Sequence, residues 1–163
     1  MRKGLILLCA VLILVVVNLG IWQNEQLIEH GETVFLELTP VDPRSLMQGD
    51  YMALNFAIAD AISKHIDSNV ESFSGHVTVQ LDAEKRASFV AIDQQQPLAD
   101  GQLQLQFRLR NGQVKFATNA FFFQEGHAEA YEAAEYGLLR VNDKGEPLLT
   151  DMVDGNFAVI EPK

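Results

Sequence analysis

The stretch LQLQFRLRNGQVKFA, residues 103–117, decides the fold, because it contains a complete β-hairpin. In its first half every second residue is apolar, an alternation typical of a strand with one buried face and one solvent-facing face. Asn111 and Gly112 divide the two halves, and Asn-Gly is the strongest short-range hairpin signal because both turn residues need a positive φ. We therefore predict antiparallel strands at 103–110 and 114–117.

Short apolar and alternating segments continue on both sides of this hairpin. Turn residues separate them, among them the charged residues at 82–86 and the sequence DKG at 143–145. The further strands that we predict are 34–38, 50–57, 76–81, 87–92, 121–123, 138–141, 147–153 and 157–160. The predicted short helices are 59–66 and 128–134. Strands that follow one another this closely pair mostly antiparallel. The predicted fold class is therefore mostly β with a minor α part: a small antiparallel β-barrel or sandwich with one or two short helices.

The apolar stretch GLILLCAVLILVVVNLGIW, residues 4–22, precedes this domain and contains one polar residue, Asn18, and no charge. As a helix, about 19 residues match the hydrocarbon core of a bilayer. Arg2 and Lys3 precede the stretch and every acidic residue follows it, so the positive-inside rule places the N-terminus in the cytoplasm. We predict a single N-terminal transmembrane helix, with Trp22 as an aromatic anchor at the interface.

Two other interpretations of the apolar stretch match the sequence less well. A cleaved signal peptide has a shorter apolar core and small residues before the cut, and NLG at 18–20 is a poor match to that pattern. A lipoprotein would be acylated at Cys9, but Leu8 stands where a small residue normally precedes such a cysteine. An uncleaved signal-anchor is therefore favoured. The predicted division is a cytoplasmic tip and transmembrane anchor at 1–22, a stalk at 23–33, and one extracytoplasmic β domain at 34–163.

Charge and cysteine content exclude several classes of function. The formal net charge is -10, and because ten of the 12 basic and all 22 acidic residues follow the apolar stretch, that part carries -12. A surface this acidic repels phosphate groups, so we expect neither nucleic-acid binding nor flat docking on anionic lipid headgroups. Cys9 is the single cysteine, so the outer domain has no disulfide, thiolate metal site or cysteine nucleophile. We expect no cofactor.

The densest group of turn-forming and charged residues is PVDPRSLMQGDY, residues 40–51. Proline fixes a turn, a neighbouring aspartate can accept backbone N–H groups, and glycine adopts backbone conformations that are closed to other residues. The residues concerned are Asp42, Pro43, Arg44, Gly49 and Asp50. Two interpretations stay open. The segment is either a rigid turn that leads into a core strand with Tyr51 packed over it, or a surface loop that presents Arg44, Asp50 and Tyr51 to a partner.

The strand GDYMALNF, residues 49–56, resembles the signature of the GDYXXLXY family of bacterial membrane-anchored proteins. Other segments similar to that family are PVDPRSL at 40–46, FFQEG at 122–126, YE at 131–132 and LRV at 139–141. Phe56 departs from the signature, which has tyrosine there, so we expect a packing role for this ring. The motif or partner-binding positions that the resemblance indicates are Asp42, Pro43, Arg44, Gly49, Asp50, Tyr51, Leu54, Phe56, Glu125 and Gly126.

The resemblance implies a location rather than a reaction. Members of the family that the chain resembles are often encoded beside polytopic membrane proteins, and the resemblance therefore implies an accessory role in the envelope. The expected function is that of a non-catalytic protein anchored in the bacterial inner membrane. Its C-terminal domain would lie in the periplasm and would bind or support a polytopic membrane protein.

Two alternative functions stay open. The first is a membrane-anchored serine hydrolase that uses Ser45 and a lysine base, although no lysine lies in the apolar setting that such a base needs. The candidate bases are Lys64, Lys85 and Lys115. The second is a weak metal site, in which carboxylates on one stripe of a predicted helix would bind calcium. The candidate ligands are Glu125, Glu129 and Glu132, with His127 off the stripe.

Overall fold

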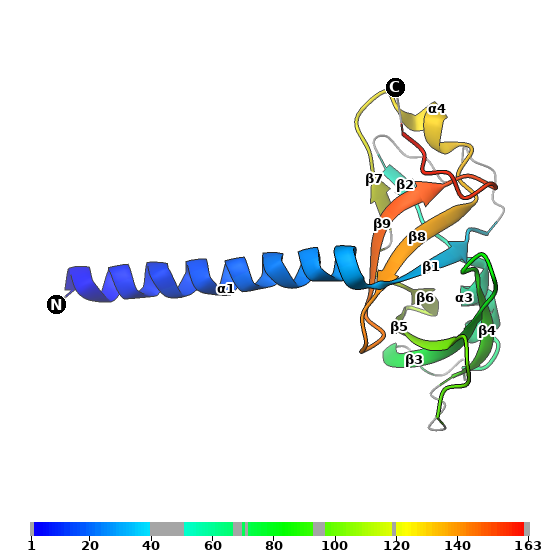
Figure 1. Cartoon of the computed structure of the whole chain (residues 1–163), viewed down its shortest axis with the longest axis horizontal. Coiled ribbons are helices and arrows are strands. Elements are labelled where there is room, and N and C mark those ends of the chain that lie inside the picture. Colours follow the sequence, from blue (N-terminus) through cyan, green and yellow to red (C-terminus); the bar gives the residue numbers. More distant parts are fainter. Residues whose placement is uncertain are drawn as a thin grey trace.

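In the computed structural model, one long helix projects from the side of a β domain (Figure 1). The structure describes residues 2–39, 51–66, 70, 72–92, 97–118 and 120–161. The long helix is α1 (Arg2–His30), and the chain enters the first strand of the domain after a single further residue. The apolar stretch therefore lies outside the β domain.

α1 is one uninterrupted helix of 29 residues that contains the apolar stretch and most of the predicted stalk. From Ile6 to His30 it is long and apolar enough to span a membrane, and its most apolar part is not buried inside the protein. These 25 residues extend about 37 Å, compared with about 30 Å for the hydrocarbon core of a bilayer. Leu12 and Trp22 are both more than half exposed. A helix that is apolar on all sides and lacks a protein partner is typical of a membrane span.

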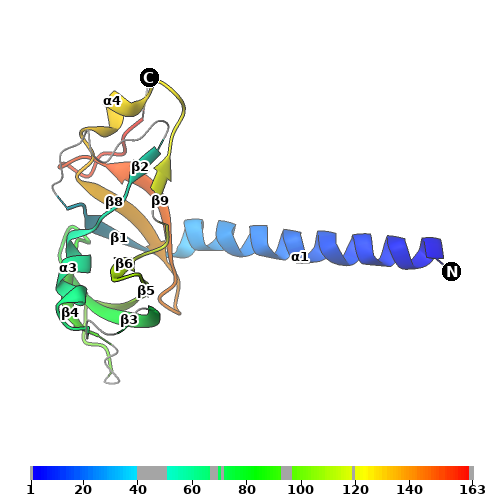
Figure 2. The same ribbon diagram turned by 180° about the vertical axis from the view of Figure 1, so that it is seen from behind.

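Antiparallel sheets make up the described part of the domain. A four-stranded sheet has the order β4-β3-β5-β6, a three-stranded sheet has the order β1-β8-β9, and β2 pairs with β7. The strands are β1 (Glu32–Glu37), β2 (Tyr51–Ala53), β3 (Ser72–Leu81), β4 (Ala87–Ile92), β5 (Gln102–Arg110), β6 (Gln113–Lys115), β7 (Ala120–Phe122), β8 (Tyr136–Val141) and β9 (Pro147–Val153). The short helices are α3 (Ala57–Ser63) and α4 (Ala128–Tyr131). The strands curl into a half-barrel (Figures 1 and 2), which confirms the predicted fold class.

Backbone hydrogen bonds join the two larger sheets at two points. The Phe35 N–H on β1 donates to the Lys85 carbonyl oxygen beside β4 at 3.0 Å. The Gln106 N–H on β5 donates to the Gly145 carbonyl oxygen in the β8–β9 turn at 2.7 Å. A Cβ at Gly145 would lie 2.6 Å from the Gln104 carbonyl oxygen, and its φ is 79°, so only glycine allows this close approach. The β8–β9 turn is thereby fixed against β5.

The hydrophobic core is completed by α3, which contacts β1, β4 and β6. Ile58 and Ile62 on this helix are buried, and Ile62 is fully enclosed. Phe107 on β5 and Phe116 after β6 are each 1% exposed, and their ring centroids are 6.5 Å apart. Burial of each such side chain contributes about 1.5–3 kcal/mol. These side chains form part of one core cluster to which β1, β5, β8 and α3 all contribute.

The signature strand is shorter than predicted. The prediction was a strand at 50–57, whereas β2 covers 51–53, and pairing resumes only as a single bridge between Phe56 and Leu38. The reason is that α3 begins at Ala57, two residues earlier than the predicted helix 59–66. The helix predicted at 128–134 is likewise a single turn, α4.

The strand predicted at 157–160 is also replaced by a turn and one bridge, between Val159 and Val153. The Asp154 carboxylate accepts the backbone N–H groups of Asn156 and Ala158, each at 2.9 Å. These bonds, the one from Ala158 foremost, lower the pKa of the Asp154 carboxyl. An aspartate that binds the backbone in this way favours a turn over an extended strand.

Candidate functional site

The signature strand has one buried face and one outer face. Met52, Leu54 and Phe56 are 3%, 8% and 5% exposed, whereas Tyr51 on the other face is half-buried. Several predicted site residues lie outside the described part of the chain: Asp42, Pro43, Arg44, Gly49, Asp50 and also Ser45. The two interpretations of the 40–51 segment, and the serine hydrolase alternative, therefore stay predictions.

The outer face of β2 carries an aromatic pair that the sequence does not reveal. Tyr51 lies opposite Phe122 on β7, with the ring centroids 5.7 Å apart. The Phe122 side chain is 74% exposed. Figures 1 and 2 both place β7 on the side of the domain from which α1 projects. Aromatic residues are enriched at protein contact surfaces, so this pair is a candidate contact site.

Phe56, which stands at the position of the signature tyrosine, has a packing role, as predicted. Its ring lies edge-on to Phe116, with the centroids 6.0 Å apart. Gly137 on β8 faces the same ring, and a Cβ there would lie 3.0 Å from Phe56 Cε1. The absence of a side chain at Gly137 therefore makes room for Phe56, which connects the signature segment to the three-stranded sheet.

The second motif segment, which includes Glu125 and Gly126, forms a turn that leads into α4. Both residues are exposed, and Gly126 has a φ of 88°, a conformation that favours glycine. Beyond the turn, Tyr131 of α4 lies against the rings of Phe121 and Phe123, with centroid distances of 5.2 Å and 5.1 Å. The turn thus returns the chain so that α4 packs against β7.

The geometry does not assemble the predicted acidic stripe. α4 is only one turn long, so Glu125 precedes it and Glu132 follows it. Within the residues that the structure describes, no three His, Cys, Asp or Glu side chains converge as metal ligands. Of the candidate lysine bases, Lys85 is paired with a carboxylate instead, because its Nζ lies 2.6 Å from Glu32 Oε1. The described carboxylates therefore do not favour a metal site, and the ion pair of Lys85 does not favour its use as a base.

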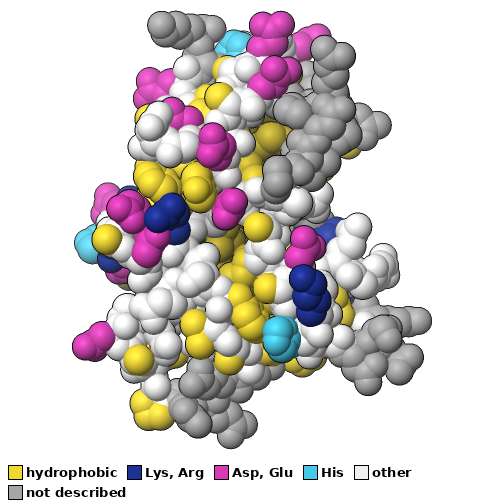
Figure 3. Space-filling view, turned by 90° about the vertical axis from the view of Figure 1, so that its right-hand side faces the viewer, with side chains coloured by type: hydrophobic (Ala, Val, Ile, Leu, Met, Phe, Trp, Pro, Cys, Tyr) yellow, Lys and Arg dark blue, Asp and Glu magenta, His cyan; other side chains and the backbone are white. Residues whose placement is uncertain are grey.

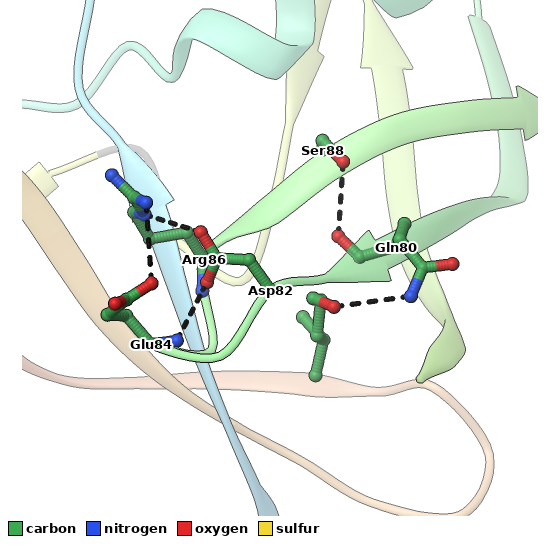
Figure 4. Close-up of polar contacts among 6 residues, drawn as sticks. Gln80, Asp82, Glu84, Arg86 and Ser88 are labelled. Atoms are coloured by element: carbon green, nitrogen blue, oxygen red, sulfur yellow. Dashed lines mark hydrogen bonds and ion pairs between the residues drawn. The ribbon is translucent and has the colours of Figure 1, made fainter. Parts of the chain in front are cut away.

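A carboxylate and a guanidinium hold the turn between β3 and β4 (Figure 4). Asp82 accepts the backbone N–H groups of Glu84 at 3.0 Å and Arg86 at 2.9 Å. The Arg86 Nε donates to the second oxygen of the same carboxylate at 2.6 Å. Desolvation opposes ionisation of Asp82, but the hydrogen bonds from Arg86 and its charge outweigh it and lower the pKa of the Asp82 carboxyl. The Arg86 guanidinium also lies 5.9 Å from the Phe157 ring centroid, so this network is a structural clamp.

The junction between α1 and the domain is tighter than a flexible linker. Arg140 on β8 donates from Nη1 to the Thr33 hydroxyl at 2.6 Å and to the Gly31 carbonyl oxygen at 3.2 Å. A Cβ at Gly31 would lie 2.5 Å from the Leu27 carbonyl oxygen. Glycine therefore lets the chain leave the helix and pass directly into β1, and Arg140 fastens that exit to β8.

A pocket of about 470 Å³ lies between the last turns of α1 and the β8–β9 turn. Trp22 and His30 line it from the helix, and Asn142 and Lys144 line it from the turn. The Asn142 side chain accepts the N–H groups of Lys144 at 3.0 Å and Glu146 at 2.9 Å, which gives the turn a defined shape. The sequence predicts this turn, but it contains no local signal that places the turn beside a helix more than 100 residues away.

The comparisons with known proteins agree with the signature strand. The family described as GDYXXLXY protein matches residues 13–152 of the chain. No match is found among curated proteins or among solved structures. The matched range extends from the middle of α1 into β9, and it includes β2, the turn at Glu125 and Gly126, and β8. It covers well over half of the chain, and this protein therefore belongs to the GDYXXLXY family.

Proposed function

We propose that this protein is a non-catalytic, membrane-anchored protein of the bacterial envelope and an accessory partner of a polytopic inner-membrane protein. In this proposal α1 is an uncleaved signal-anchor with its N-terminus in the cytoplasm, and the β domain lies in the periplasm. The observation that carries the proposal is α1, an exposed apolar helix of spanning length that continues into the domain without a flexible linker.

The stalk sets the height of the domain above the membrane. From Trp22, at the expected interface, to His30 the helix rises about 12 Å. The Arg140 bonds to Gly31 and Thr33 limit rotation of the domain about the helix end. A short and fixed stalk suits contact with a neighbouring membrane protein better than capture of distant soluble ligands.

The aromatic pair of Tyr51 and Phe122 is the proposed contact with that partner. It lies on the side of the domain from which α1 projects, so a protein in the same membrane can reach it (Figure 1). An exposed ring of this size gives a large apolar contact at a low cost in conformational entropy. The 40–51 segment, with Arg44, leads directly into Tyr51 and is the proposed second part of the contact.

The test is a pull-down from native membranes in mild detergent, with the intact protein and two matched variants. Phe122→Ser removes the exposed ring, and Val90→Ser removes a 39% exposed apolar side chain from β4. We expect one polytopic membrane protein to co-purify with the intact protein and with Val90→Ser. Its yield should fall at least about tenfold with Phe122→Ser, the effect of losing an aromatic hot spot.

Two results would contradict the proposal. If no integral membrane protein co-purifies with the intact form, the accessory role is wrong. If a partner co-purifies equally with Phe122→Ser, the aromatic pair is not the contact, and Arg44→Ala then tests the 40–51 segment separately.

A further inference from the structure

Three basic side chains meet in a pocket on the outer face of the four-stranded sheet. Arg108 and Arg110 are two residues apart on β5, so both point to the same side, and Lys115 on β6 lies directly opposite Arg108. With Ala117 and Thr118 they line a pocket of about 310 Å³. The pocket thus concentrates positive charge in a domain whose formal charge is strongly negative.

No carboxylate pairs with these three cations among the residues that the structure describes. The described ion pairs involve other cations, namely His30, Lys85 and Arg86. Arg110 donates to the Ser72 hydroxyl, and Arg108 donates to the Ala117 carbonyl oxygen at 3.4 Å, so both bind neutral groups. Like charges directly opposite each other on neighbouring strands destabilise a sheet. The glutamines earlier on this face of β5 show that neutral side chains suit the same environment.

The backbone at the edge of this pocket is also unusual. Ala117 has a φ of 37°, a left-handed conformation that a residue with a Cβ adopts only at a cost in free energy. The carbonyl oxygen of this same residue accepts the hydrogen bond from Arg108 at 3.4 Å. A residue with a left-handed backbone therefore contacts one of the three cations.

β5, which carries two of the three cations, meets the β8–β9 turn. Gln106, two residues before Arg108, donates its N–H to Gly145 in the β8–β9 turn. The same turn lines the pocket beside the last turns of α1. β5 is thus joined to the turn that borders the last turns of α1. If α1 spans the bilayer, this end of β5 lies on the membrane-proximal part of the domain.

We propose that Arg108, Arg110 and Lys115 form a binding site for the phosphate of an anionic phospholipid headgroup in the adjacent leaflet. This inference rests on the anchoring by α1 proposed above. A guanidinium group can bind two phosphate oxygens through parallel hydrogen bonds, and a lysine adds a point charge with three donors. Together with α1, this contact fixes the rotation of the domain about the membrane normal.

The acidity of the whole domain does not prevent such a contact. At physiological ionic strength, interactions between exposed charges are screened beyond about 8 Å. A headgroup in the pocket is therefore attracted by three adjacent cations and only weakly repelled by carboxylates on distant faces. Net charge predicts repulsion from anionic lipids, whereas the distribution of charge predicts a local attraction on this one face.

The test uses the full chain in nanodiscs of phosphatidylcholine, with and without phosphatidylglycerol, and measures amide hydrogen exchange over residues 105–118. Phosphatidylglycerol should slow exchange in this segment several-fold, and high salt should abolish the effect. The variant Arg108→Gln with Lys115→Gln should lose the protection. Its thermal midpoint should equal or exceed that of the parent protein, because a pair of like charges is removed.

The control variant is Lys64→Gln with Lys85→Gln, which changes the net charge equally but alters α3 and the β3–β4 turn. It should retain the protection by phosphatidylglycerol. Equal loss in both variants would show a non-specific charge effect and would overturn the assigned site. A lower thermal midpoint for the Arg108 and Lys115 variant would assign these residues a structural role instead.

Two further measurements are needed. The first distinguishes a lipid headgroup from a soluble anion, and the second distinguishes a failure of membrane anchoring from a failure of the lipid site. Inorganic phosphate is added to the protein in an uncharged detergent micelle, and protection there would indicate a soluble anion and overturn the lipid assignment. Co-elution with nanodiscs is scored independently. A chain that does not co-elute contradicts the anchoring, whereas a chain that co-elutes but shows no effect of phosphatidylglycerol contradicts only the lipid site.

Discussion

The Asp82 carboxylate does more for the β domain than an exposed acidic side chain usually does. It accepts two backbone N–H groups and the Arg86 Nε, and Arg86 in turn covers the Phe157 ring. Phe157 contacts the rings of Phe35 and Tyr136, with centroids 4.9 Å and 5.0 Å away. One carboxylate therefore connects the β3–β4 turn to the C-terminal segment and the three-stranded sheet.

The variant Asp82→Asn should lower the thermal midpoint near neutral pH. The folded-state pKa of Asp82 lies below its unfolded value, so ionised Asp82 stabilises the fold above the unfolded pKa, about 3.9, and this contribution is lost as pH falls through the folded pKa. The difference between parent and variant should therefore shrink as pH decreases below about 4. Thermal unfolding of the full chain in detergent, followed by circular dichroism across this pH range, measures it.

The control for this measurement is Asp100→Asn, in an exposed turn. It removes the same charge, so a pH-dependent loss of equal size in both variants would assign the effect to net charge rather than to the Asp82 network. If the thermal midpoints of the parent protein and Asp82→Asn differ by the same amount at all pH values, the destabilisation comes from hydrogen-bond geometry alone and not from the charge of Asp82.

Hairpins with local turn signals were predictable from the sequence, whereas pairings between distant segments were not. Asn111 and Gly112 have φ values of 50° and 74°, as the predicted turn requires, and β5 and β6 pair across them. The pairing of β1 with β8 has no such signal, because about 100 residues separate the two strands. Alternating patterns identify the buried face of a strand but not its neighbour.

The candidate sites were likewise predictable only where they depend on one local segment and not on the pairing of distant segments. The alternation in the signature strand correctly separated Phe56 and Tyr51 onto opposite faces, but it did not show which face is buried. It could not reveal that Phe122 lies beside Tyr51, since β2 and β7 meet only in the folded chain. The predicted hairpin already places Arg108 opposite Lys115, but the sequence could not show that β5 lies beside the end of α1, because that depends on how the β8–β9 turn docks on β5.

The contact between β8 and the signature segment gives an element-scale prediction. In Gly137→Ala the new Cβ would lie 3.0 Å from both Phe56 Cε1 and Leu149 Cδ1. Such overpacking should lower the free energy of unfolding by about 1–3 kcal/mol. Urea unfolding of the full chain in detergent should show a lower midpoint with an unchanged slope.

A double variant shows whether Phe56 is the cause. Phe56→Leu leaves space beside β8, so adding Gly137→Ala to it should cost less than adding Gly137→Ala to the parent protein. A coupling energy of about 0.5 kcal/mol or more between the two sites would confirm direct packing. If the effects simply add, the strain lies at Leu149 or in the β8 backbone.

The whole molecule combines one apolar helix with a domain that carries two candidate contacts. The aromatic pair on β2 and β7 lies toward α1 (Figures 1 and 2), and the basic pocket lies on β5 and β6, of which β5 is joined to the β8–β9 turn beside α1. The opposite face, seen in Figure 3, carries acidic side chains mainly in its upper half, with apolar side chains across its middle and lower part. Two contacts on different strands, together with α1, would hold the domain on a membrane surface in one orientation.

The last turns of α1 should therefore fix the orientation of the β domain relative to the membrane, in addition to attaching the domain to it. Proline at Gln26 would remove one helical hydrogen bond and clash with the carbonyl of Trp22, at a cost of about 3 kcal/mol that a kink relieves. We expect Gln26→Pro to remain in the membrane after alkaline extraction and to unfold at the parent's thermal midpoint. Both partner yield in the pull-down and protection of residues 105–118 by phosphatidylglycerol should fall, whereas Gln26→Ala should retain both. If Gln26→Pro also retains both, the two contacts form without a fixed stalk, and the domain finds its orientation through them alone.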